Sequence, residues 1–186
     1  MLRRILFAAV GALIIGGFTP QVRAHQSDDR LDGLFTRLKQ TSDLAEGRHI
    51  TRQIRIIWRQ TDNVAANEAL NKAGAQLYLR RFDEALVALD RALAAQPDLA
   101  EAWSRRAAVH YLLGDYPSAL ADIRRTLALE PRHFGALAEL GAIYMRLEEF
   151  PAAEAALEKA LEVNPHLIAT RQNLKAVKRR LAGEPA

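Results

Sequence analysis

Small and apolar residues recur at a fixed interval of 34 residues through the second half of the chain. An interval of this size is typical of a helical hairpin that stacks on copies of itself. Proline, aliphatic, aromatic and small residues each keep the interval over three copies. The seven columns are Pro97/Pro131/Pro165, Ala85/Ala119/Ala153, Phe82/Tyr116/Phe150, Leu89/Ile123/Leu157, Leu93/Leu127/Leu161, Ala92/Thr126/Ala160 and Ala73/Ala107/Gly141.

Each copy predicts two antiparallel helices. In the second copy, the first helix (102–113) ends at the turn Gly114-Asp115, and the second helix (117–129) ends before the next proline. Pro117 stands in a first helical turn, where a missing N–H is tolerated, whereas a proline inside a helix would break it. Small residues in the columns let the paired helices approach closely. The pattern predicts three repeats, over residues 66–99, 100–133 and 134–167.

Helical spacing of apolar residues continues on both sides of the repeats. It predicts one helix over 28–39 and another over 43–59. We interpret residues 25–65 as an N-terminal hairpin that packs on the first repeat. Residues 168–186 are interpreted as a helix and tail that cap the stack with a polar face, as a stack needs at its end. The predicted fold class is all-α: a right-handed solenoid of antiparallel helix hairpins with a C-terminal capping helix.

The repeats resemble the tetratricopeptide repeat (TPR) family, whose unit is a 34-residue helical hairpin with small, aromatic and proline positions in this order. The best copy reads EAWSRRAAVHYLLGDYPSALADIRRTLALEP, residues 101–131. Repeat 3 departs from it, with Glu148-Glu149 in place of the Gly-Asp turn. The stretches LDGLFTRLK, IRIIW and EPRHFGAL also resemble short exported TPR proteins of α-proteobacteria. That resemblance implies a periplasmic or envelope protein without enzymatic activity.

Residues 1–24 have the pattern of a secretory signal peptide. Two arginines precede an uninterrupted apolar run over 5–18, and Val22-Arg23-Ala24 resembles a cleavage site. The run of 14 residues is shorter than the roughly 20 that a spanning helix needs. We expect cleavage after Ala24 and a periplasmic protein, with an uncleaved signal anchored in the inner membrane as the alternative. The arginine pair leaves open whether export uses the Sec or the twin-arginine route.

Cleavage would change how the charge is interpreted. The chain carries a net charge of +4, and residues 1–24 contain three arginines and no acid, so the mature chain would carry +1. A nearly neutral chain gives no reason to expect a nucleic-acid partner. The absence of cysteine excludes disulfides and thiolate metal sites.

The TPR resemblance implies a concave face, lined by the first helix of each repeat, that holds a segment of a partner protein. Chaperone-binding members grip a terminal carboxylate with a Lys and an Asn, which Leu70 and Gly74 replace here, so such a clamp is not expected. The implied groove residues are Asn67, Asn71, Tyr78, Arg105, Tyr111, Glu139, Met145 and Arg146. Arg105, Tyr111 and Arg146 are of the types common in binding hot spots. For each groove residue, an ordinary solvated helix face is the simpler interpretation.

The C-terminal helix offers a second surface, which could associate with anionic lipid or polymer. Its cations are Arg171, Lys175, Lys178, Arg179 and Arg180. No Trp or Phe accompanies them to insert into a membrane, which weakens this alternative.

No phosphate loop, nucleophile elbow or pair of metal ligands on one helix is present, so no catalytic residue, cofactor or metal is predicted. Arg132 and His133 lie in the turn between repeats 2 and 3. We expect them to cap a helix end and to stay solvated, with a protonatable contact for a partner as the alternative.

Overall fold

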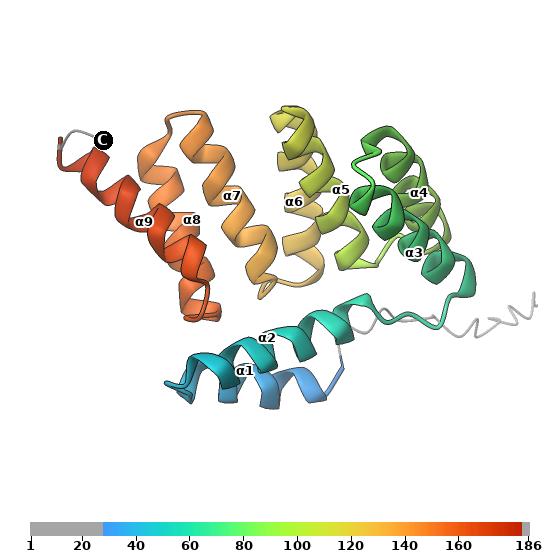
Figure 1. The fold of residues 1–186 in the computed structure, drawn as a ribbon, viewed down its shortest axis with the longest axis horizontal. Coiled ribbons are helices and arrows are strands. Elements are labelled where there is room, and N and C mark those ends of the chain that lie inside the picture. Colours follow the sequence, from blue (N-terminus) through green and yellow to red (C-terminus); the bar gives the residue numbers. More distant parts are fainter. Residues whose placement is uncertain (1–27, 184–186) are drawn as a thin grey trace, which may run out of the picture.

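The computed structural model of the protein describes residues 28–183, which form nine helices and no strand (Figure 1). The predicted signal peptide over 1–24 lies outside the described residues. The helices are α1 Arg30–Gln40, α2 Leu44–Arg59, α3 Val64–Tyr78, α4 Phe82–Ala95, α5 Ala100–Leu113, α6 Tyr116–Leu129, α7 Phe134–Arg146, α8 Phe150–Val163 and α9 Ile168–Leu181.

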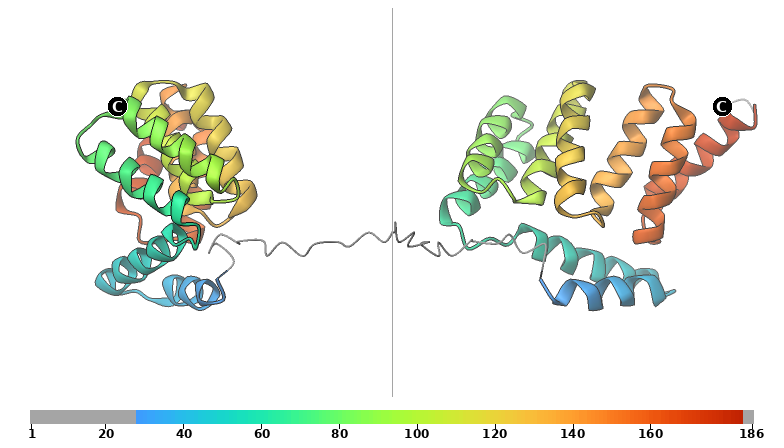
Figure 2. Two further views of the ribbon diagram at one scale, coloured as in Figure 1. Left: turned by 90° about the vertical axis from the view of Figure 1, so that its right-hand side faces the viewer. Right: turned by 180° about the vertical axis from the view of Figure 1, so that it is seen from behind.

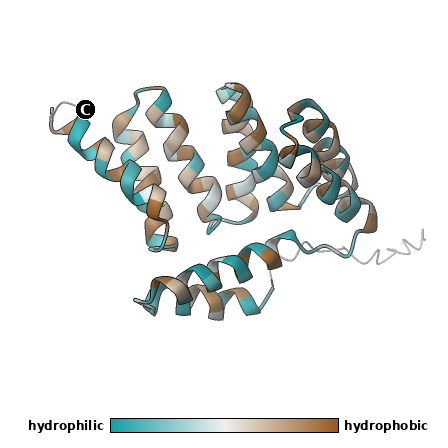
Figure 3. Cartoon of the chain, viewed as in Figure 1, coloured by the Kyte–Doolittle hydropathy of each residue, from teal (hydrophilic) through white to brown (hydrophobic). Residues whose placement is uncertain are grey.

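Helices α3 to α8 form three antiparallel pairs that stand in a row, and α9 packs against α8 at the end of the row (Figures 1 and 2). Hydrophobic and hydrophilic residues alternate along these helices, as amphipathic packing requires (Figure 3). Small residues bring the paired helices close together. At Gly141 of α7, an added Cβ would stand 2.5 Å from the Leu157 side chain of α8. The predicted all-α solenoid with a C-terminal capping helix is confirmed.

Each pair of helices turns at a residue in the left-handed backbone conformation. Gly114 ends α5 with φ 79°, and the equivalent residues of the other repeats are Arg80 at 56° and Glu148 at 60°. A residue with a Cβ costs about 1 kcal/mol in this conformation, so only repeat 2 makes the turn without strain. Asp115 then begins α6, because its carboxylate accepts the backbone N–H of Ser118.

The N-terminal hairpin, α1 and α2, was predicted to pack on the first repeat, but its apolar face packs on repeat 3. It runs across the lower edge of the row in Figure 1, along the turns that join one repeat to the next. The apolar face of the hairpin shares its buried cluster with Phe134, Leu137, Ala160 and Val163, all from repeat 3. Trp58, near the end of α2, accounts for this position, because its ring packs against His133 and Phe134 at the junction of repeats 2 and 3.

Contacts with the outer two inter-repeat turns show that α2 crosses the whole row. After the first repeat, Gln96 accepts a hydrogen bond from Thr61, which follows the end of α2. After the third repeat, Asn164 Nδ2 donates to Thr51 Oγ1, in the middle of α2, at 3.0 Å, and the His166 ring lies against Gly47 in the first turn of α2. The helix therefore has its last residues beside the first repeat and its first residues beside the third.

The middle turn is buried under the N-terminal hairpin. His133 is 3% exposed, its Nδ1 accepts the backbone N–H of Ala136 at the start of α7, and its ring stacks on Trp58 at 4.3 Å between centroids. Arg132 lies over the Phe35 ring and donates to an acid of α1 at 2.6 Å. His133 thus caps a helix as expected, but the expectation that it stays solvated is wrong.

Two glycines of the N-terminal hairpin give opposite predictions. An added Cβ at Gly47 of α2 would lie 2.4 Å from the ring of His166, whereas Gly33 of α1 has nothing within 4 Å. Because alanine favours a helix over glycine, Gly33→Ala should raise the free energy of unfolding by about 0.5–1 kcal/mol. Gly47→Ala should lower it by about 1–3 kcal/mol through overpacking. Urea denaturation measures both, and equal effects would contradict the contact between α2 and His166.

Candidate functional site

Two adjoining cavities lie between α2 and the first helices of the repeats. The larger, about 520 Å³, is lined by Ile56, Arg59, Gln60, Thr61, Asp62, Asn67, Leu70 and Asn71. The smaller, about 310 Å³, is lined by Arg55, Trp58, Arg59, Glu101, Ser104, Arg105, His133, Phe134 and Gly135. Because Arg59 lines both, the two cavities form one groove, which we call the α2 groove.

Three of the predicted partner-binding residues lie in the α2 groove. Asn67 and Asn71 are exposed on α3, and Arg105 extends from α5 to within reach of α3. The opposite wall contains Arg55 and Arg59 of α2, which the repeat pattern did not single out. No column could have identified them, because α2 lies outside the repeats and its position depends on contacts distant in the sequence.

Arg105 is held by a neighbouring carboxylate. Its Nε donates to Glu101 Oε1 at 2.8 Å, and the other oxygen of Glu101 lies 3.4 Å from His133 Nε2. Burial opposes ionisation of Glu101, but the hydrogen bond with His133 and the charge of Arg105 outweigh burial and lower the pKa of this carboxyl. Glu101 is therefore a fixed negative charge in the groove.

The other predicted residues at the ends of α3, α5 and α7 do not line the α2 groove. Tyr78 is 88% exposed, and Arg146 is exposed, with its pKa raised by the hydrogen bond that it donates to the Tyr111 hydroxyl. Tyr111 packs against Tyr116, with 6.0 Å between ring centroids, and Met145 packs into the cluster under α9. Tyr111 and Met145 are thus half-buried packing residues. Of these four side chains, only Tyr78 and Arg146 are exposed to solvent.

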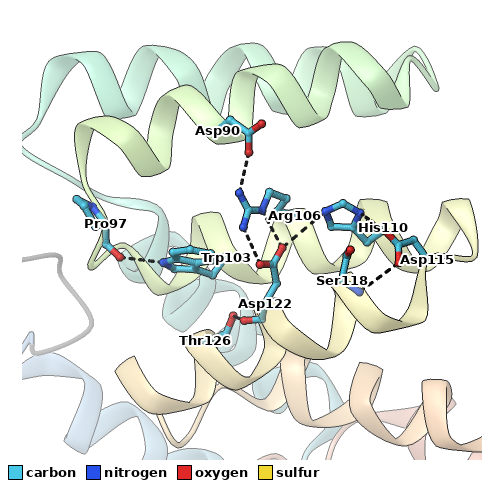
Figure 4. A network of polar contacts seen from close by, with 9 residues as sticks. All are labelled: Asp90, Pro97, Trp103, Arg106, His110, Asp115, Ser118, Asp122 and Thr126. Carbon is cyan, nitrogen blue, oxygen red and sulfur yellow. Dashed lines mark hydrogen bonds and ion pairs between the residues drawn. The ribbon is translucent and has the colours of Figure 1, made fainter.

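A network around Arg106 ties the helices of repeats 1 and 2 together (Figure 4). Arg106 donates to both carboxylate oxygens of Asp122 at 2.8 Å, and to Asp90 of α4 at 2.7 Å. The hydrogen bond with Asp122 is the main cause that raises the pKa of Arg106. The guanidinium also lies over Trp103, 4.7 Å from its ring centroid. Because the network joins α4, α5 and α6, it belongs to the scaffold rather than to the α2 groove.

Comparison with known proteins agrees with this architecture. Residues 70–160 match the sequence model of the family described as anaphase-promoting complex, cyclosome, subunit 3. A TPR repeat-containing protein of Rhizobium etli is 36% identical over 87 residues, which cover 47% of this chain and 43% of that protein. The chain carries tetratricopeptide repeats. The match spans less than half the length of the Rhizobium protein.

Solved TPR domains share the fold. The first TPR of Spaghetti (RPAP3), bound to the HSP90 peptide SRMEEVD, has a TM-score of 0.63 at 22% identity and covers 65% of this chain and 96% of its own. The TPR2B domain of yeast Sti1, in its complex with pHsp70, has a TM-score of 0.58 at 22% identity. The match covers 62% of this chain and 98% of that domain. The Arabidopsis OM64 TPR domain has a TM-score of 0.61 at 18% identity and covers 62% and 96%.

The TPR stack ends in α9, whose cations were predicted as a second surface. A shallow cavity of about 380 Å³ is lined by Arg171, Leu174, Lys175, Lys178 and Arg179, and Arg180 is exposed beside it. Lys178 donates to Glu158 at 2.7 Å and lies 3.6 Å from Glu154, and Arg171 donates to the Pro165 carbonyl. Two of the five predicted cations, Arg171 and Lys178, are therefore engaged in contacts within the TPR stack.

Glu139, in the middle of α7, predicts a pH dependence of stability. Burial raises the pKa of its carboxyl from 4.5 to about 7. The folded protein then keeps a proton that the unfolded chain releases. The stability that this proton contributes is fully present below pH 4.5 and is lost as the pH rises through 7. From about pH 5 to about pH 8, the parent should lose about 2 kcal/mol more stability than Glu139→Gln. Urea denaturation at both pH values measures this, and parallel pH profiles would contradict it.

Within residues 28–183, no group of three or more His, Asp or Glu residues could hold a metal ion. No helix in the same part of the chain is long and apolar enough to cross a membrane.

Proposed function

We propose that the chain is a non-catalytic interaction module that holds a polypeptide segment of another protein in the α2 groove. The observation that carries this proposal is the pair of adjoining cavities, about 520 and 310 Å³, into which Asn67, Asn71 and Arg105 project. Amide side chains can pair with the N–H and C=O groups of a peptide backbone, and guanidinium groups bind carboxylates. The HSP90 peptide bound to the Spaghetti TPR domain supports the same mode of use.

The proposed place of action is the periplasm or cell envelope, with another envelope protein as the partner. The support is the signal-like pattern of residues 1–24 and the similarity to a protein of Rhizobium etli. The mature protein should begin at His25, which N-terminal sequencing of a periplasmic fraction would measure. A cytoplasmic product that keeps Met1 would contradict this, and a membrane-bound product that keeps Met1 would favour the anchored alternative.

Site-specific photo-cross-linking in cells tests the binding proposal. A photoreactive amino acid in place of Asn71 should give an adduct with another protein, because this position lines the α2 groove. The matched control is Arg91, exposed on α4, which should give none. The variant Asn67→Ala/Asn71→Ala/Arg105→Ala, with the photoreactive group at Ser104, should lose the adduct that Ser104 gives in the parent. Adducts from neither groove position, or equally from Arg91, would overturn the proposal.

A second candidate is association of α9 with anionic lipid or polymer, which the basic cavity at α9 favours. Its test is the variant Lys178→Gln/Arg179→Gln/Arg180→Gln. If this variant loses envelope association and the groove variant keeps it, α9 is the functional surface.

A further inference from the structure

All four arginines of α2 lie on one stripe of the helix. Arg48, Arg52, Arg55 and Arg59 are spaced by four, three and four residues, so at about 100° per residue they fall within about 60° of arc. At 1.5 Å per residue they extend over roughly 16 Å. All four are exposed, whereas the buried residues of α2 lie on the other side. We call these four residues the arginine stripe.

The folded chain pairs none of these charges with an acid, although Arg55 lies over the Phe134 ring, 5.6 Å from its centroid. Among residues 28–183, no member of the arginine stripe has a carboxylate oxygen within the 4.0 Å of an ion pair, although Arg30, Arg37, Arg105, Arg106 and Arg132 each do. Glu46, the one acid of α2, pairs with Arg37 of α1. Like charges three or four residues apart disfavour a helix, so ion pairing does not explain why four arginines share this stripe.

The arginine stripe borders the α2 groove. Arg55 and Arg59 line the smaller cavity, and Arg59 also lines the larger one. In the middle of the helix, Thr51 accepts a hydrogen bond from Asn164 after the third repeat, and Gly47 in its first turn lies against the His166 ring. The stripe therefore follows the row of repeats from the first towards the third.

We infer that the α2 groove binds an acidic polypeptide segment whose carboxylates pair with the arginine stripe. This inference rests on the proposed function and gives the chemical class of its partner. An extended chain places alternate side chains on one side about 6.6 Å apart, close to the roughly 6 Å between Arg48 and Arg52 or between Arg55 and Arg59. Arginine also binds carboxylates through two parallel hydrogen bonds. A segment with acidic residues at alternate positions would meet one guanidinium after another.

The opposite wall favours a peptide over a continuous polyanion. Asn67 and Asn71 offer amide groups that match a peptide backbone. Glu101 lines the smaller cavity and Asp62 the larger one. These carboxylates would repel the regularly spaced phosphates of a nucleic acid, which carries a charge at every nucleotide. A peptide can place neutral residues opposite them.

Binding of two synthetic peptides to the whole chain tests the inference. The probe is a fluorescent ten-residue peptide with Glu at every second position, and its matched control carries Gln at those positions. Three proteins are compared: the parent, the stripe variant Arg52→Gln/Arg55→Gln/Arg59→Gln, and the α9 variant Arg171→Gln/Arg179→Gln/Arg180→Gln, which removes the same charge from α9. The Glu peptide should bind the parent and the α9 variant alike, and the stripe variant at least about tenfold more weakly. The Gln peptide should bind the parent about tenfold more weakly than the Glu peptide does. Added salt should weaken binding of the Glu peptide to the parent.

The inference fails if the Gln peptide binds the parent as tightly as the Glu peptide, a comparison that does not depend on any variant folding. It also fails if the stripe variant, with an unchanged circular dichroism spectrum, keeps the parent's affinity. Binding of single-stranded DNA or phosphatidylglycerol vesicles without binding of the Glu peptide at millimolar concentration would likewise overturn it. A cross-link from position 71 that survives in the stripe variant would remove this inference and leave the proposed function intact.

Discussion

Replacement of Trp58 by alanine should lower the free energy of unfolding by about 3–5 kcal/mol. The indole is 1% exposed and touches three rings: His133 at 4.3 Å, Phe134 at 4.9 Å and Phe35 at 6.0 Å between centroids. These rings belong to α1 and to the start of α7, so the indole of α2 joins the two helices of the N-terminal hairpin to repeat 3. Because the large side chain fills the centre of that contact, its loss leaves a cavity that the neighbours cannot close. Guanidinium denaturation followed by far-UV circular dichroism measures the effect.

The matched variant Trp58→Phe keeps an aromatic ring and should lose less than half as much stability. Hydrogen exchange locates the damage in Trp58→Ala. Amides of α1 and α2 should lose protection, whereas those of α3 and α4 should keep it, because repeat 1 contributes nothing to the cluster around Trp58. Unchanged protection of α1 and α2 would contradict docking of the hairpin through this side chain.

Asp122→Ala should destabilise the fold by about 3 kcal/mol, because it removes the partner of a partly buried cation. Asp122 is 5% exposed at its side chain and binds Arg106 through both oxygens. Asp90→Ala removes the other partner of Arg106, but its side chain is 60% exposed. That variant should cost less than about 1 kcal/mol. Thermal and urea denaturation of both variants measure the difference.

A double variant separates the loss of the ion pair from the loss of packing. The positions equivalent to Arg106 and Asp122 in repeat 3 are Leu140 and Ala156, so repeat 3 carries no charge at either position. Arg106→Leu/Asp122→Ala should therefore recover most of the stability that Asp122→Ala loses. If the double variant is as unstable as the single one, the unpaired charge is not the cause.

The sequence predicted the helices of the repeats well, because each one appears three times with the same spacing of small and large residues. A further column at the same 34-residue interval held a signal for His133. The equivalent residues of the other two turns are Leu99 and Leu167, and a column with two leucines indicates burial. Solvation was expected because only the turn's polar character was considered.

Features that occur once could not be predicted from the columns. Asp122 stands in a column whose other members are Ala88 and Ala156, so its pairing with Arg106 is specific to repeat 2. The position of the N-terminal hairpin depends on contacts such as Arg132 with Asp32, which are 100 residues apart. Spacing along one helix carries no information about such a partner, so the wall of the groove that α2 forms, with Arg55 and Arg59, was not predicted.

The path of α2 across the row changes the order in which the chain can fold. A plain solenoid has contacts between neighbouring repeats only, so folding can begin in any repeat and the ends open independently. Here the His166 ring meets the Leu38 carbonyl, 128 residues away, and contacts of such high sequence separation slow folding. During synthesis the N-terminal hairpin emerges first, yet the partners of Trp58 are made only with residues 133 and 134. The first helices to leave the ribosome are therefore among the last to reach their final contacts.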